Sequence, residues 1–142
     1  PVFSPDILPY QILLAALINH PALFDQVEET LGHLAVPNER LDLLRQTILN
    51  ILGAEPALDT EGLKSHLKGH GYASELKAVL SDTVYTHAGF ARPGAPEDTI
   101  LSGWQETCAF MQKKAFRMEL KAAGKALALD FPDAYQLARE KI

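Results

Sequence analysis

Two histidines at a helical spacing are the first residues of this chain that could do chemistry. His66 and His70 are four positions apart, so a helix would present both imidazoles on one face to a single metal ion. The zinc-protease pattern needs Glu directly after the first His, and Leu67 stands there instead. A third ligand is also missing from the pattern. We expect two solvated histidines near a helix end, with a small helical metal-binding protein as an alternative.

The single cysteine is the second residue type that could be reactive. Cys108 stands among Trp104, Phe110 and Met111 on the apolar side of a predicted helix. A nucleophilic thiol needs a nearby cation or base, so the pattern predicts a small buried thiol instead. One Cys also excludes an internal disulfide framework and a multi-cysteine zinc site. From these parts we predict no catalytic residue, no metal site and no cofactor.

Basic side chains are concentrated in one segment of an acidic chain. The net charge is −5 and the pI is about 5.5, with −5 carried by residues 1–96 and zero by 97–142. Sequence-independent binding to phosphates needs clustered cations, and Glu106 and Glu119 interrupt the basic segment. We therefore expect a solvated face and no strong direct nucleic-acid binding. The basic residues are Lys113, Lys114, Arg117, Lys121 and Lys125.

Composition predicts the kind of elements that position these side chains. Leu (22) and Ala (19) far outnumber Val (5) and Ile (7). This ratio favours helix over strand, because straight-chain side chains lose little rotamer freedom in a helix. The longest apolar run, 12–18, is too short to span a membrane. The sequence therefore predicts an all-α protein without a membrane-spanning segment.

A helical bundle is expected over residues 1–88. The run 12–18 is apolar on every side, which is typical of a buried helix. Asn38 and Asp59 are good N-terminal caps, and Gly and Pro residues separate the helical segments. The predicted helices run from Pro9 to Asn19, from Pro21 past Leu31, from Asn38 to Gly53, from Asp59 to Gly69, and over 73–86.

A linker over 89–95 and a helical hairpin over 96–142 are predicted to follow the bundle. Segment 87–96 contains two Gly and two Pro, which is typical of a linker. A long helix over 97–129 then carries two apolar stripes, and Asp130 is a cap for a short final helix. That short helix cannot cover both stripes. One stripe therefore faces the bundle, a partner chain or solvent, and an exposed stripe would mark a protein-binding surface.

The order of several leucine-rich motifs is similar to one protein family. Segment 13–21, LLAALINHP, resembles the LLxxLLxHP opening of the C-terminal domain of bacterial DnaG-type primases. Leu23-Phe24, LDLLR at 41–45 and LKSHL at 63–67 follow in the family's order. The ending is also similar, with a long helix that carries Trp104, then ALALD and a short final helix. The resemblance covers about residues 8–142, and the chain departs from it in the Gly- and Pro-rich segment before the long helix.

The resemblance implies a helicase-binding domain. In that family a helical bundle stimulates the DnaB-type replicative helicase, and the hairpin that follows docks on the helicase's N-terminal domains. Contact with single-stranded-DNA-binding protein is also implied, whereas primer synthesis belongs to an upstream domain. Since the short helix must pack partly on the long one, we expect its outward side chains to bind the partner. These are Phe131, Tyr135, Leu137, Arg139 and Ile142.

A second related family remains an alternative. The N-terminal domain of the replicative helicase itself has a similar opening, but an acidic residue stands where this chain has His20-Pro21, which favours the primase. The chain begins at Pro1, and we expect it to be a piece of a longer cytoplasmic protein with no membrane partner.

Overall fold

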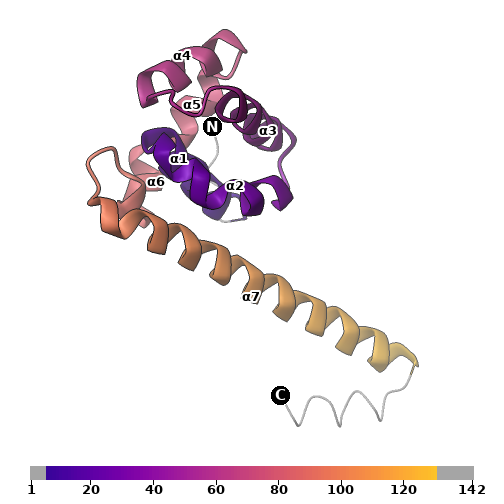
Figure 1. The fold of residues 1–142 in the computed structure, drawn as a ribbon. Helices are drawn as coiled ribbons and strands as arrows, with labels where there is room; N and C mark the ends of the chain where they lie inside the picture. Colours follow the sequence, from indigo (N-terminus) through magenta and orange to yellow (C-terminus); the bar gives the residue numbers. More distant parts are fainter. Residues whose placement is uncertain (1–5, 131–142) are drawn as a thin grey trace. The chain divides into compact units, whose positions relative to one another are not determined.

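Helices make up the fold throughout the described part of the chain. The computed structural model describes residues 6–130, with side chains to residue 126, and within these limits it contains no strand (Figure 1). The prediction of an all-α protein is therefore confirmed. The α-helices are α1 (Leu8–Asn19), α2 (Phe24–His33), α3 (Glu39–Ala54), α4 (Thr60–Gly69), α5 (Ala73–Val79), α6 (Asp82–His87) and α7 (Glu97–Asp130), and the 3-10 turns are η1 (Pro21–Leu23) and η2 (Gly89–Ala91).

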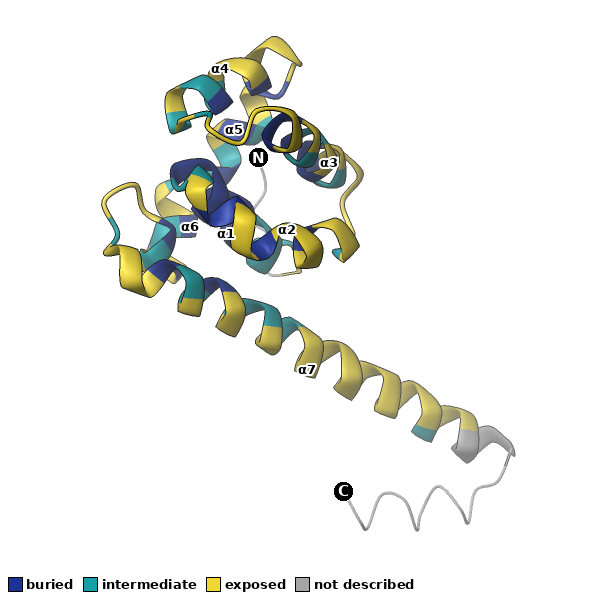
Figure 2. Ribbon diagram, viewed as in Figure 1, coloured by how far each residue is buried: buried dark blue, intermediate teal, exposed yellow. Residues whose placement is uncertain are grey.

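The first helix lies at the centre of the core. Its residues from Leu13 to Ile18 are fully buried, as the run of apolar residues predicts (Figure 2). Helix α1 contacts α4, α5, α6 and η2, while α2 packs against α3. A helix that is covered on all sides leaves its polar backbone ends to be satisfied by protein groups rather than by water.

Three side-chain caps set where helices begin. The Asn38 side chain accepts a hydrogen bond from Leu41 N at 2.9 Å, and Asp59 accepts one from Gly62 N at 2.8 Å, as predicted. The expected single helix over 73–86 is wrong, because the chain forms α5 and α6 there instead. Ser81 is extended and its hydroxyl accepts from Val84 N, so it starts a new helix in the middle of the predicted one.

The end of α1 is joined to the segment that was predicted to be a linker. The Asn19 side-chain amide donates to the Ala91 carbonyl at 2.8 Å and to the Tyr85 hydroxyl at 2.9 Å. His20 Nε2 donates to the Arg92 carbonyl at 2.7 Å. Ala91 itself is fully buried. Segment 89–95 is therefore part of the first compact unit.

The first turns of α7 belong to the same core. Ile100 and Trp104 are buried, and Trp104 Nε1 donates to the Leu13 carbonyl at 3.1 Å. Gly103 faces the ring of Phe90 so closely that a Cβ at this position would collide with it. The chain divides into compact units between Thr107 and Cys108, inside α7, rather than at 89–95.

The short final helix of the predicted hairpin lies outside the described residues. In residues 6–130, no helix has both the length and the apolar character that crossing a bilayer requires.

Two glycine-to-alanine substitutions should have opposite effects on stability. Gly103→Ala should lower the free energy of unfolding by about 1 kcal/mol, because the collision with Phe90 outweighs the gain in helix propensity. Gly53→Ala, in open space on α3, should raise it by about 0.5–1 kcal/mol. Urea unfolding followed by circular dichroism measures both. A gain in stability for Gly103→Ala would contradict the close packing of η2 on α7.

Candidate interaction surface

The second compact unit, from Cys108 on, carries most of the exposed large apolar side chains in the described part of the chain. Five large apolar side chains of residues 6–126 are exposed, and four of them belong to this unit. Figure 2 shows the change along α7, which contains buried residues in its first turns and is mainly exposed beyond them. The four are Phe110 (57% exposed), Phe116 (60%), Met118 (63%) and Leu120 (44%).

These side chains lie on different faces of α7. At about 100° per residue, Phe116 and Leu120 are one turn apart on the same face, whereas Phe110 lies roughly 80° or more away from both. Of the two predicted apolar stripes, the one that contains Phe116 and Leu120 is therefore exposed at these positions. Because Ile100 and Trp104 account for the buried face nearer the start of the helix, one helix supplies both core and surface.

Cations occupy the face that includes Phe110. Lys113, Arg117, Lys121 and Lys125 are each four residues apart and all are exposed. We call these four residues the cationic row. Each step along it rises about 6 Å, so it is about 18 Å long. Like charges at this spacing destabilise a helix by about 0.2–0.5 kcal/mol per pair, a cost that a bound polyanion would remove.

Charge is divided between the two units. The unit that ends at Thr107 has six basic and fourteen acidic residues, a net charge of −8. The unit that begins at Cys108 has seven basic and four acidic residues, a net charge of +3. Glu119 lies about 200° around the helix from Arg117 and from Lys121, so it does not interrupt the row. The net charge of the second unit is thus opposite in sign to that of the whole chain.

The two predicted metal-ligand candidates share an open groove. His66 and His70 line a groove of about 550 Å³ between α3 and α4, and His66 Nε2 lies 3.3 Å from Glu55 Oε2. No three His, Cys, Asp or Glu side chains come together in residues 6–126 in a way that could hold a metal ion. For the metal-binding alternative, the described residues therefore provide a contact between His66 and Glu55 rather than a set of three ligands.

The thiol of Cys108 is half-buried on α7. Burial raises the pKa of this thiol above its ordinary value, because the thiolate loses hydration. A raised pKa reduces the thiolate fraction, which is the opposite of what a nucleophile needs.

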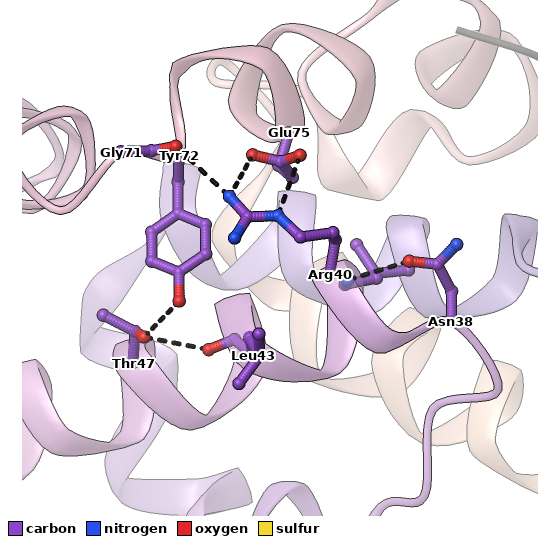
Figure 3. A network of polar contacts seen from close by, with 8 residues as sticks. Asn38, Arg40, Leu43, Thr47, Gly71, Tyr72 and Glu75 are labelled. Carbon is purple, nitrogen blue, oxygen red and sulfur yellow. Dashed lines mark hydrogen bonds and ion pairs between the residues drawn. The ribbon is translucent and has the colours of Figure 1, made fainter.

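A polar cluster joins α3 to the turn between α4 and α5 (Figure 3). The Arg40 guanidinium donates to both carboxylate oxygens of Glu75 and to the Gly71 carbonyl, and it lies 5.0 Å from the centroid of the Tyr72 ring. The Tyr72 hydroxyl lies 2.9 Å from the Thr47 hydroxyl. The hydrogen bond from Arg40 lowers the pKa of Glu75. Since these side chains bind one another, the cluster holds α3 to the turn between α4 and α5.

A buried arginine of α3 binds an aspartate of its own helix and the end of α2. Arg45 is buried, with its Nε donating to Asp42 at 2.8 Å and its Nη1 donating to the Leu31 carbonyl at 3.0 Å. A cation against the last carbonyls of α2 also suits the helix dipole. The hydrogen bond from Arg45 lowers the pKa of Asp42 below its ordinary value, and a hydrogen bond from Gln46 adds to this.

The predicted partner-binding residues are not among those that the structure describes. Phe131, Tyr135, Leu137, Arg139 and Ile142 lie outside the described residues. What the structure adds is the exposed apolar face and the cationic row on α7. Comparison with known protein families, with characterised proteins and with solved structures gives no match for this chain.

Acid should weaken the fold partly through Asp42. Its pKa is lowered in the folded state, so its contribution to stability is full above the ordinary carboxyl pKa of about 3.9 and is lost as pH falls through the lower folded value. Asp42→Asn should therefore reduce the free energy of unfolding at pH 7 by on the order of 1 kcal/mol and should flatten its fall below about pH 4.

Urea unfolding at several pH values measures this effect, and Glu28→Gln at an exposed site on α2 is the matched control. An unchanged acid dependence in Asp42→Asn would mean that the pair with Arg45 contributes nothing to acid sensitivity.

Proposed function

We propose that this chain is the helicase-binding domain of a DnaG-type primase and that it recruits the primase to a DnaB-type replicative helicase in the cytoplasm. The proposal rests on the motif order from LLAALINHP onward, and on an all-helical fold in which that segment is the central buried helix. The domain itself is an adaptor. Primer synthesis belongs to an upstream part of the parent protein.

The observation that carries the proposal is the concentration of exposed large apolar side chains on α7. A contiguous apolar face on a protein surface is typical of a protein-binding site. Phe116 and Leu120, one turn apart and both exposed, can enter a groove of a partner as the anchors of an amphipathic helix do. We assign the main contact with the helicase to the hairpin region, 96–142, including Tyr135 and Arg139.

Contact through the hairpin also explains the division of charge between the two units. The first unit, at −8, presents a polar acidic exterior around its core and has one exposed large apolar residue, Leu43, in its described part. Such a unit contributes little to affinity, although it can stimulate the helicase after the hairpin has bound. Single-stranded-DNA-binding protein is the second partner that the resemblance supports.

Titration of the replicative helicase of the same organism tests the proposal. Phe116→Ala combined with Leu120→Ala, and separately Tyr135→Ala combined with Arg139→Ala, should each weaken binding by roughly thirtyfold, since losing an interface anchor costs about 2 kcal/mol. Leu43→Ala, an exposed leucine on α3, is the matched control and should bind like the unaltered chain.

A shortened chain separates the two regions. A chain that ends at Thr107 retains Ile100 and Trp104, and therefore the buried part of α7, whereas a chain that ends at residue 95 loses both. If the chain that ends at Thr107 binds the helicase as tightly as residues 1–142, the assignment to the hairpin is wrong.

A further inference from the structure

The cationic row on α7 has no role in the contact proposed above. Arg117, Lys121 and Lys125 lie about 60° or more around the helix from both Phe116 and Leu120, whereas Lys113 lies near the face of Leu120. Phe110 lies on the row's own face. Phe110 is seven residues before Arg117 and eleven before Lys121. Around the helix axis, each of these two cations therefore lies within about 20° of Phe110. The row and Phe110 together form a surface of regularly spaced cations with an exposed aromatic ring at one end.

We propose that this surface binds single-stranded nucleic acid. Regular cations fit a regular polyanion, and the row's length of about 18 Å matches roughly five nucleotides at a rise of ~3.4 Å per nucleotide. Phe110, with 57% of its surface exposed, offers a ring on which an unpaired base stacks. In a duplex the base faces are covered by their neighbours, so the aromatic side chain favours a single strand.

The charge of the whole chain does not oppose this contact locally. The described residues 108–126 hold five basic side chains and one acidic one, Glu119, which lies on the far side of the helix from Arg117 and Lys121. Glu106 lies on the row's side, but about 10 Å before Lys113 along the helix. The expectation of no strong nucleic-acid binding rested on the charge of the whole chain and on the positions of Glu106 and Glu119 in the sequence. The separation of charge between the units and the placement of these two acids allow binding of modest strength.

The affinity should be modest and strongly dependent on salt. Contacts to four phosphates of a single strand predict that the logarithm of the binding constant falls with the logarithm of salt concentration at a slope of about −3. We expect a dissociation constant on the order of 10⁻⁵ M near physiological salt.

Fluorescence anisotropy of a labelled oligothymidylate of about 16 nucleotides, titrated with the full chain, tests the proposal. Arg117→Gln combined with Lys121→Gln should weaken binding by about fivefold or more and should halve the salt slope to about −1.5. The matched control, Lys68→Gln combined with Lys77→Gln, removes the same charge from exposed positions in the first unit and should leave both values unchanged. Phe110→Ala should weaken binding by about fivefold to tenfold, and Phe110→Trp should restore it.

Several results would overturn the proposal. Equal weakening of binding by the control pair would show that only the total charge matters. A duplex of the same length that binds with the same affinity as the single strand would contradict the stacking role of Phe110. A polyglutamate peptide of matched charge that binds as tightly as the oligothymidylate would assign the row to an acidic protein instead. Circular dichroism of each variant confirms that the helices remain. The assay contains no helicase, so its outcome is independent of the proposed function.

Discussion

The buried amide of Asn19 is the interaction on which the described fold depends most. Helix α1 is buried from Ile12 to Asn19 and covered by other elements, so the polar groups at its carboxyl end bind other parts of the protein. The Asn19 side chain binds the Ala91 carbonyl and the Tyr85 hydroxyl, and the Asn19 backbone carbonyl accepts from Thr60. These bonds bring α4, α6 and η2 to one point. Without them, burying α1 would leave polar groups unpaired at a cost of about 1–3 kcal/mol each.

That constraint extends to α7 through the residues next to it. With Ala91 held against Asn19, Phe90 lies against Gly103, and Trp104 reaches the Leu13 carbonyl. Glycine at position 103 costs helix propensity, and the close approach of an aromatic ring explains why it is present. The start of α7 is therefore a core element. Beyond Thr107 the same helix carries exposed aromatic residues and cations, and there it provides a surface for partners.

Local signals predicted much of the fold, and long-range contacts account for what was missed. Asn38 and Asp59 could be identified as caps because a side-chain acceptor before a helix acts on its own nearest amides. The Ser81 hydroxyl caps α6 in the same way. The apolar residues on both sides of Ser81 keep a helical spacing, however, so the sequence pattern did not indicate that one helix ends and another begins there. The bonds from Asn19 to Ala91 and from Arg45 to Leu31 join distant segments, so no local pattern indicates them. The two apolar stripes of the long helix could be recognised in the sequence. That the second unit has a net charge opposite in sign to that of the whole chain became clear only with the boundary at Thr107.

Hydrogen exchange along α7 tests most directly the claim that one helix serves as both core and surface. Amides of residues 100–107 should exchange as slowly as those of α1, because both belong to the same buried unit. Amides of residues 111–126 should exchange at least about tenfold faster in the isolated chain, because few buried contacts protect that part of the helix. Uniformly slow exchange over the whole of residues 100–126 would contradict the account.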